Sequence, residues 1–407
     1  MKVLLSAYAC RPGEGSEPGV GFQTLMGIAE HHDVWVITRR KNAAALTQSL
    51  MAHPFSQRIH LEPLDLSRFD LLAKNWLRGL GLQIYYERWQ LAAGRLARSL
   101  DKRVGFDVVH HVTFSADWSR VGVATADVPF VWGPVGGGIK APLSLLPSAG
   151  WRGLGAEIAR RCIRALLRRR RSNRHAWQSA QVVLVQNVET GRLGSQPAET
   201  TKVRLLPNST AVDLPVINVR GPRSKEILVV GRLIPWKGGS LALKTFRRVS
   251  SPGSVLVFIG DGPELRRLQR IARRWRLADR VQFHGSLPRS EVVDRVARAG
   301  ALLHLAFHEE NSMAVAEALS LGTPVVCLDW GGPAELVRQW PTSPAVAVPV
   351  GRIEATAAAA AAAIDRFLRD PPPILTEKLS PRTSFSSLLM SSYDEAISQG
   401  RGTTRLS

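Results

Sequence analysis

Short apolar runs alternate with longer helical patterns along most of the chain, and this alternation limits the fold more than any other feature of the sequence. Strands that are apolar throughout and are separated by helices are typical of a parallel sheet with both faces covered. The sequence therefore predicts an α/β protein. The expected strands are KVLLSAY, DVWVITR, RIHLEPL, FDVVHH, VPFVW, QVVLVQ and KVRLLP, followed by EILVVGR, SVLVFIGDG, RVQFHGS, ALLHLAF and TPVVCLDW.

The pattern lapses once, over residues 209–224, in a stretch that contains Pro, Gly and Ser. A chain of 407 residues is long enough for two or three domains. We predict two doubly wound, Rossmann-like domains, 1–212 and 225–381, joined by the 209–224 linker. A last helix over 383–398 could join the N-terminal domain or dock on the other. Because ligands bind beyond the carboxyl ends of such strands, two facing sheets would form a deep cleft.

Two glutamates flank the start of a predicted helix in the segment HEENSMAVAEALSLGTPVVCLDWGGPAEL. Glu309 follows a strand, and Glu317 lies eight residues later, in a helix that we expect to begin near Ser312. The N–H groups at a helix N-terminus favour a phosphate. Two carboxylates beside it can accept hydrogen bonds from sugar hydroxyls. The alternative is a capped helix with Glu317 in a surface ion pair.

Two cations follow the strand of VVGRLIPWKGG, at Arg232 and Lys237. Five residues apart across a turn, they can hold one pyrophosphate, Arg by its fork and Lys as a point charge. Arg and Lys pairs are usually solvated, so the motif gains weight only from the glutamates in the same predicted domain.

The C-terminal half resembles the GT-B glycosyltransferases, in particular the large retaining family 4. The matching pieces are GRLIPWKGG, FIGDGPEL, VQFHGSL, the Glu309-x7-Glu317 element and TPVVCLDWGGPAEL, which together span residues 225 to about 338. In the N-terminal half, AYACRPGEGSEPGVGF, FDVVHHVTF and VPFVWGPVGGG look like the branch of that family that builds bacterial exopolysaccharides and related glycans.

The resemblance implies roles for residues on the donor side. Arg232 and Lys237 match the pair that binds the donor diphosphate and stabilises the leaving group. Glu317 matches the carboxylate that holds the ribose hydroxyls, and Glu309 matches the one that contacts the donor sugar. The segment between the glutamates is usually Gly-rich but reads EENSM here, and this departure leaves the donor sugar open. Ser312 and Met313 are also predicted donor-binding residues.

Other expected site residues lie in the N-terminal half. Gly19 matches a glycine of the first loop, where a missing side chain lets the backbone approach the donor phosphates. His111 matches the histidine near the reacting centre, and its neighbour His110 should point to the opposite side of the strand. The stretch WGPVGGG would line the acceptor side or form a tight buried turn; its candidates are Trp132, Gly136 and Gly137.

The reaction implied by the resemblance is transfer of a hexose with retention at the anomeric carbon. The co-substrate is a nucleotide diphosphate sugar, the acceptor is a glycan or a lipid-linked oligosaccharide, and no cofactor or obligatory metal is expected. The positive field of Arg232, Lys237 and the Ser312 helix end agrees with this, and the sequence has no Asp-x-Asp that would bind a cation. A GT-B sugar-nucleotide epimerase is the alternative enzyme.

Basic residues outnumber acidic ones, with 54 Lys and Arg against 33 Asp and Glu, a net charge of +21. Part of the excess lies in 152–174, where apolar residues recur every four positions and five arginines lie mostly elsewhere on the helix: Arg160, Arg161, Arg164, Arg168 and Arg171. Such a helix can lie on an anionic membrane. The alternative is an ordinary helix packed on the sheet with a solvated Arg face.

We expect no nucleic-acid partner, because Trp177 is the only aromatic residue just beyond the first Arg run and no reading module is recognisable. Three distant cysteines imply neither a disulfide framework nor a zinc site. No apolar run approaches the length of a membrane span. These features favour a cytoplasmic protein that can also sit at the inner face of the plasma membrane.

Overall fold

The computed structural model describes residues 1–14, 16–51, 53–67, 69–72, 78–194, 202–208, 221–375, 377–381 and 384–403. The chain divides into two compact units. Unit 1 consists of Met1–Gly138, Ile163–Ala211 and Ser384–Ser407, and unit 2 of Ile139–Cys162 and Val212–Thr383. Each unit contains one parallel sheet, as the strand pattern predicts. Most of the predicted linker, 209–220, lies outside the described residues.

Unit 1 contains a seven-stranded sheet in the order β3-β2-β1-β4-β5-β6-β7. The strand order changes direction between β1 and β4, as in a doubly wound fold. Its strands are β1 (Lys2–Ser6), β2 (Asp33–Thr38), β3 (Ile59–Pro63), β4 (Val108–His111), β5 (Phe130–Val135), β6 (Val182–Val185) and β7 (Val203–Leu205). Its helices include α1 (Ser16–Ala29), α2 (Arg40–Leu50), α4 (Arg78–Val104), α6 (Arg171–Ser179), α7 (Val188–Gly191) and α15 (Phe385–Thr403).

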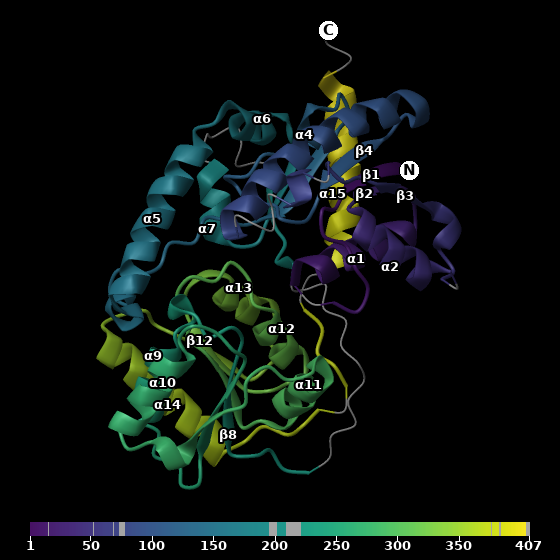
Figure 1. Cartoon of the computed structure of the whole chain (residues 1–407). Coiled ribbons are helices and arrows are strands. Elements are labelled where there is room, and N and C mark those ends of the chain that lie inside the picture. Colours follow the sequence, from purple (N-terminus) through teal and green to yellow (C-terminus); the bar gives the residue numbers. More distant parts are fainter. Residues whose placement is uncertain are drawn as a thin grey trace. The chain divides into compact units, whose positions relative to one another are not determined.

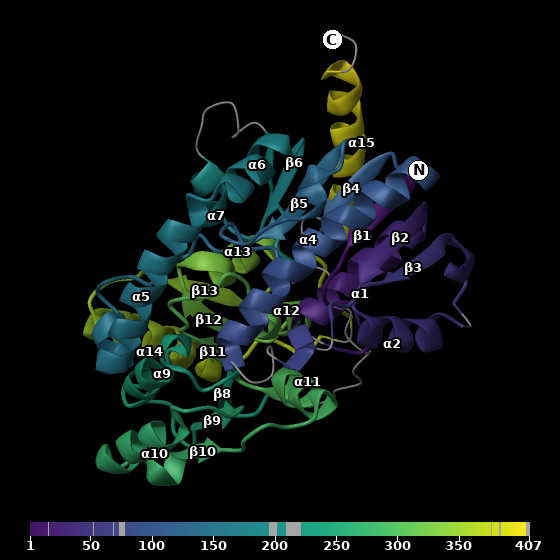
Figure 2. The same cartoon turned by 45° about the horizontal axis from the view of Figure 1, so that its top comes forward.

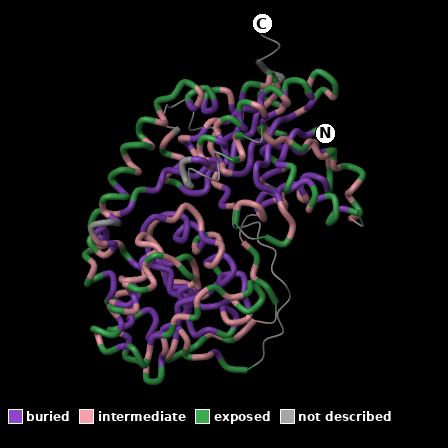
Figure 3. The backbone as a smooth tube through the Cα atoms, viewed as in Figure 1, coloured by how far each residue is buried: buried purple, intermediate pink, exposed green. Residues whose placement is uncertain are grey.

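The inner strands of this sheet are buried on both faces, which explains why they are largely apolar. In β1, Val3 and Leu5 pack into one core cluster with residues of α1 and α15, whereas Leu4 packs into the other with residues of α4. Figure 3 shows the strands as largely buried and the helices as partly exposed. The terminal helix α15 therefore belongs to unit 1, beside α1 and the middle of the sheet (Figure 1).

Unit 2 repeats the design with a six-stranded sheet in the order β10-β9-β8-β11-β12-β13, which Figure 2 shows with its strands side by side. The strands are β8 (Glu226–Val230), β9 (Val255–Ile259), β10 (Val281–Phe283), β11 (Ala301–His304), β12 (Val325–Leu328) and β13 (Ala345–Val348). The helices are α9 (Gly239–Phe246), α10 (Leu265–Arg274), α11 (Arg289–Arg298), α12 (Met313–Ser320), α13 (Gly331–Gln339) and α14 (Ile353–Arg369).

The structure differs from the sequence predictions in four places. Strand β13 was not expected. Helix α1 begins at Ser16, before Gly19, and β5 continues through Val135. The predicted domain boundaries, 1–212 and 225–381, also differ from the compact units, because Ile139–Cys162 groups with unit 2. This segment contains the first two thirds of α5 (Gly150–Arg168), a helix that begins in unit 2 and ends in unit 1.

Candidate functional site

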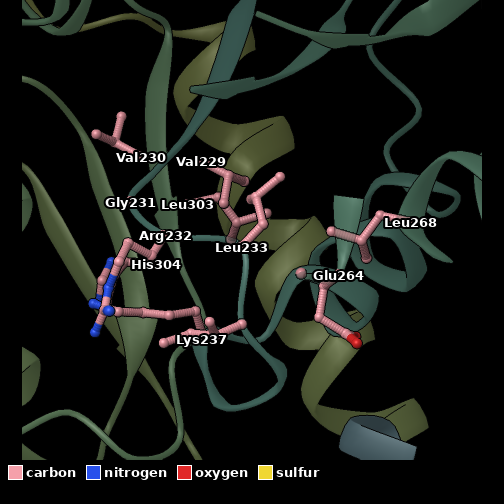
Figure 4. Close-up of a pocket in the computed structure, with 12 residues that line it drawn as sticks. Val229, Val230, Gly231, Arg232, Leu233, Lys237, Glu264, Leu268, Leu303 and His304 are labelled. Atoms are coloured by element: carbon pink, nitrogen blue, oxygen red, sulfur yellow. The ribbon is translucent and has the colours of Figure 1, made fainter. Parts of the chain in front are cut away.

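A pocket lies in unit 2 where β8 and β11 end, at the point where the strand order changes direction. Ligands of open α/β sheets bind at such a point, because the connections leave the sheet in opposite directions there. Arg232, Lys237 and His304 point toward one another at one end of the pocket, as Figure 4 shows. Glu264 and apolar side chains such as Leu233 and Leu268 line the rest.

Backbone conformation at two glycines shapes this end of the pocket. Gly231 directly follows β8 and has a φ of +135°, and Gly238 follows the 3-10 turn Pro235–Lys237 with a φ of +75°. A Cβ atom on Gly238 would lie 2.0 Å from the carbonyl oxygen of Leu305. A side chain is therefore excluded, and the turn that holds Lys237 packs directly against the chain that leaves β11.

The two predicted cations differ in their surroundings. The Arg232 side chain is exposed and has no ion pair with any residue in the described ranges, whereas Lys237 Nζ pairs with Glu309 Oε2. The structure thus brings together Arg232, Lys237 and Glu309, three residues that the sequence assigned to one site. Their predicted roles on a diphosphate and a sugar stay predictions.

Glu309 is a buried carboxylate beside a cation. Burial raises its pKa, and the charge of Lys237 acts in the opposite direction. The loop that contains Glu309 also packs against the start of α13, where Gly332 N donates to Glu309 O at 3.1 Å. A Cβ atom on Gly332 would lie 2.1 Å from the carbonyl oxygen of Glu310, so the loop can approach α13 this closely only because residue 332 is glycine.

His304, the last residue of β11, is a member of this cluster that sequence reasoning missed. Its Nε2 lies 3.8 Å from Glu309 Oε2, and its side chain is 5% exposed. Burial and the nearby charge of Lys237 lower the pKa of His304 to about 3, so the ring is neutral near pH 7. The available signal was a lone histidine at the end of the otherwise apolar strand ALLHLAF.

The start of α12 is built as predicted. Ser312 is its N-cap, and the Ser312 side chain accepts a hydrogen bond from the backbone N–H of Val315. Met313, the first residue of α12, is half-buried. Asn311 Oδ1 accepts from Ser312 N at 2.8 Å, which fixes the turn before the helix. The N–H groups of this first turn form the positive end of the helix dipole, which favours an anion.

Glu317 lies one turn further along α12 and pairs with Arg289 of α11, at 2.7 Å between Oε1 and Nη1. The predicted alternative, a capped helix with Glu317 in an ion pair, is therefore present in this structure. The glutamate of this ion pair does not lie on the surface, because Glu317 is buried. Burial raises the pKa of Glu317, and the charge of Arg289 acts in the opposite direction.

In unit 1, His111 is completely buried between α4 and β1. Its Nε2 lies 3.2 Å from Tyr86 Oη and its Nδ1 3.2 Å from Ser6 Oγ. Burial lowers the pKa of His111 to about 3. His110 instead contacts Tyr393 of α15 at 2.8 Å, which confirms that the two rings point to opposite faces of the sheet. The predicted contact of His111 with a substrate stays a prediction.

Two other residues predicted in unit 1 have structural explanations. Gly19 lies in the first turn of α1 and not in a loop, and a Cβ atom there would be 2.1 Å from the carbonyl oxygen of Glu14. Trp132 is fully buried in the core, where its ring meets that of Trp177 edge to face at 5.1 Å. This burial argues against the predicted acceptor contact of Trp132.

Gly136 and Gly137 form the buried turn that the sequence left as an alternative. Gly136 pairs with Ala116 in a parallel bridge. Gly137 has a φ of +120°, and a Cβ atom there would lie 1.9 Å from Asp117 Oδ1. Its carbonyl oxygen accepts a hydrogen bond from Arg168 Nη2 at 2.7 Å. Neither glycine is exposed.

The arginines of α5 contradict the expectation of a solvated Arg face. Arg160 and Arg161 donate to Glu157, and Arg168 pairs with Asp117. Arg164 donates to the carbonyl oxygen of Gly137. The arginines therefore turn toward acceptors that the helix periodicity alone does not reveal.

Three apolar residues of α5 are exposed to solvent instead of these arginines. Ile158, Ile163 and Leu166 are 55%, 56% and 67% exposed. Just beyond the helix, Arg169, Arg171 and Arg174 are exposed and form no ion pair with a residue that the structure describes. We call these six residues the α5 face.

The two doubly wound units, with a pocket at the switch point of unit 2, place the chain in the GT-B class that the sequence predicted. HepE of Anabaena, solved with UDP, matches 97% of this chain and 100% of its own with a TM-score of 0.56 at 16% identity. Its complex with UDP-glucose gives a TM-score of 0.52 at 15% identity over 98% and 100% of the two chains. At these identities the likeness concerns the fold.

Residues 215–383 match the family described as Glycosyl transferases group 1. The 2-deoxystreptamine glucosyltransferase of Streptomyces kanamyceticus is 30% identical over 150 residues, 36% of this chain and 37% of that protein. The phosphatidylinositol N-acetylglucosaminyltransferase GPI3 subunit of Saccharomyces cerevisiae is 34% identical over 113 residues, 27% of this chain and 25% of that protein. The chain thus spans only about a quarter to two fifths of these two relatives.

Two further features are absent from the described ranges. None of the helices there is long and apolar enough to cross a bilayer. In the same part of the chain, no group of three or more His, Cys, Asp or Glu side chains is arranged to hold a metal ion. Metal independence stays a prediction.

Proposed function

We propose that the protein is a retaining glycosyltransferase that moves a hexose from a nucleotide diphosphate sugar to a glycan acceptor without a metal ion. The observation that supports this most is the arrangement in unit 2, where Arg232, Lys237 and Glu309 meet at the switch point of a sheet within the segment that matches Glycosyl transferases group 1. No single residue defines the activity.

The charges suit a departing diphosphate. Arg232 offers a guanidinium fork that has no ion pair among the described residues, and Lys237 is a point charge whose only ion pair in the same ranges is with Glu309. The N-terminus of α12 adds the positive end of a helix dipole. Fixed positive groups in a partly dry pocket stabilise the negative charge that develops on a leaving group. In metal-dependent enzymes a divalent cation has this role.

The remaining donor contacts are proposed for the two glutamates. The buried carboxylate of Glu317, beside Arg289, can accept hydrogen bonds from the vicinal hydroxyls of a ribose, and Glu309 can accept one from the transferred sugar. HepE was solved with UDP and with UDP-glucose, and the curated relatives are a glucosyltransferase and an N-acetylglucosaminyltransferase. A nucleotide sugar is therefore the proposed donor. A lipid-linked glycan is the proposed acceptor, for which His111 remains the candidate contact.

The epimerase alternative predicts an isomerised nucleotide sugar and no acceptor. The comparisons do not favour it, since the relatives named above are transferases. A thermal-shift panel of nucleotides and nucleotide sugars tests donor binding first, because a ligand that binds only the folded state raises the melting temperature. Product analysis by NMR then separates the enzymes. A new glycosidic bond with the donor's anomeric configuration supports the proposal, whereas an isomerised free nucleotide sugar overturns it.

The proposed site of action is the cytoplasmic surface of the plasma membrane, with the α5 face as the contact. Its apolar side chains are exposed on α5. Of its three exposed arginines, Arg169 directly follows α5, and Arg171 and Arg174 lie in the first turn of α6. Apolar side chains that enter the acyl boundary beside cations at the headgroups are typical of interfacial helices on anionic lipid. The four arginines turned toward the protein take no part in this contact.

A further inference from the structure

His304 occupies a position in the pocket that the proposed function does not yet use. Its side chain is almost completely buried, and its Nε2 has no hydrogen-bond partner among the residues that the structure describes. Buried polar atoms in folded proteins are nearly always hydrogen-bonded, so an unpaired one that faces a pocket points to a ligand or to a second arrangement of the site. Glu309 Oε2 lies 3.8 Å from His304 Nε2, just beyond hydrogen-bond distance.

Several neighbouring groups affect whether the carboxyl of Glu309 is ionised. Lys237, on the turn after β8, is its ion-pair partner. His308 and Glu310 are its chain neighbours, and their charges act on it in opposite directions. His304, on β11, lies 3.8 Å from the carboxylate. Because burial disfavours the charged form of Glu309, a nearby cation or hydrogen-bond donor is needed to favour ionisation.

A bound diphosphate would change that balance. Lys237 is the cation that the proposed function also assigns to the phosphates, so its charge would then be shared between two anions. The phosphates would in addition bring negative charge close to Glu309. Both effects favour protonation of Glu309, and a protonated carboxyl accepts hydrogen bonds from a sugar less well.

We propose that His304 is a positioning residue that donates a hydrogen bond from Nε2–H to Glu309 when a diphosphate engages Lys237. This inference rests on the proposed function. A movement of about 1 Å closes the gap to hydrogen-bond distance. The neutral ring provides a donor without adding a second positive charge to a buried site. It would keep Glu309 ionised and oriented toward the sugar while Lys237 acts on the leaving group.

The test compares His304→Leu, which removes the donor at similar size, with His304→Gln, whose amide nitrogen lies near the place of Nε2. The ligand is whichever of UDP, GDP and ADP raises the melting temperature of the wild-type protein most. Calorimetric titrations at pH 7 in two buffers of different ionisation enthalpy count the protons taken up on binding. Glu309→Gln, alone and combined with His304→Leu, has no carboxyl at residue 309. The protons counted in these variants therefore report the titration of the bound phosphate.

When the nucleoside diphosphate binds, we expect Glu309 to take up no proton in the wild type and about half a proton or more in His304→Leu. We expect His304→Gln to return to the wild-type value and the combined variant to show the phosphate contribution alone. The acid limb of the turnover profile should move up by about one pH unit in His304→Leu, a tenfold loss on that limb. Binding with no excess protons and an unmoved limb in His304→Leu would overturn the inference but leave the proposed function standing. No binding of any nucleoside diphosphate to the wild type would overturn the proposed function itself.

Discussion

Arg289 on α11 holds Glu317 on α12 through a contact of 2.7 Å between Nη1 and Oε1. The two partners differ in exposure, since the side chain of Glu317 is 7% exposed and that of Arg289 is 42% exposed. Burial raises the pKa of Glu317, and Arg289 is the charge that opposes this. The guanidinium therefore maintains the ionised carboxylate on which the proposed ribose contact depends.

Replacing Arg289 should weaken nucleotide binding in a pH-dependent way. In Arg289→Met the pKa of Glu317 rises further, so the carboxyl is protonated over a wider range of acidic pH and loses capacity as an acceptor. We expect the affinity for a nucleoside diphosphate to fall about tenfold at pH 6 and less at pH 8, measured by calorimetry. Arg298→Met is the matched control, because Arg298 pairs with exposed Asp294 on the same helix. An equal loss at both pH values would contradict this role for Arg289.

Gly332 should be intolerant of a side chain. In Gly332→Ala the new Cβ would meet the carbonyl oxygen of Glu310 at 2.1 Å, so the loop that contains Glu309 must shift. We expect a loss of more than about 1 kcal/mol in unfolding free energy and at least a tenfold fall in turnover.

Gly351→Ala serves as the control for that substitution. The nearest atom to its new Cβ would be Thr356 Oγ1 at 4.0 Å, so stability and turnover should stay close to those of the wild type. If Gly332→Ala kept wild-type stability and turnover, the close approach of the Glu309 loop to α13 would not matter to the site.

Stability at acid pH should depend on Glu157. Burial favours its protonation, but hydrogen bonds from His308 and Arg161 outweigh burial and lower its pKa to about 2. A depressed pKa means that the stabilisation is present above the unfolded value near 4.3 and is lost as the pH falls toward 2. We expect Glu157 to contribute about 2 to 3 kcal/mol of that loss between pH 5 and pH 2. Denaturant titrations of Glu157→Gln should show a smaller pH dependence, and an unchanged one would contradict the assignment.

The α5 face should bind anionic vesicles. We expect the wild-type protein to sediment with vesicles that contain phosphatidylglycerol, in a salt-sensitive way, and not with pure phosphatidylcholine. The pair Ile163→Glu and Leu166→Glu should lower this binding at least tenfold. Leu143→Glu changes an equally exposed leucine outside α5 and should have no effect. Self-association through α5 without lipid binding would show that the face meets a second copy of the chain.

Most of the fold could be predicted because its signals are local. Every expected strand is present, since a strand buried on both faces must be apolar at each position. Strand β13 was missed because it is short, its sequence AVAV is flanked by Pro344 and Pro349, and it lies at the edge of its sheet. Proline near an edge strand costs no ladder hydrogen bond, so the flanking prolines are compatible with this strand.

The orientation of α5 could not be predicted, because periodicity gives the faces of a helix but not their partners. Asp117 and Gly137, which Arg168 contacts, are distant in sequence. The one local signal was Glu157, three and four residues before Arg160 and Arg161. In the candidate site, the sequence motifs identified Lys237 and Glu309. The proposed role of His304 depends on its distance to Glu309, which only the structure shows.

The most direct test of the account is the affinity of a nucleoside diphosphate for the wild-type protein and for Lys237→Ala, measured by calorimetry. Lys244→Ala is the control, because Lys244 is also paired with a carboxylate in unit 2, that of Glu354. We predict that Lys237→Ala weakens binding by about a hundredfold, as expected for the loss of one charged contact to a phosphate, while Lys244→Ala binds as the wild type does. Equal affinities in all three proteins would contradict the account.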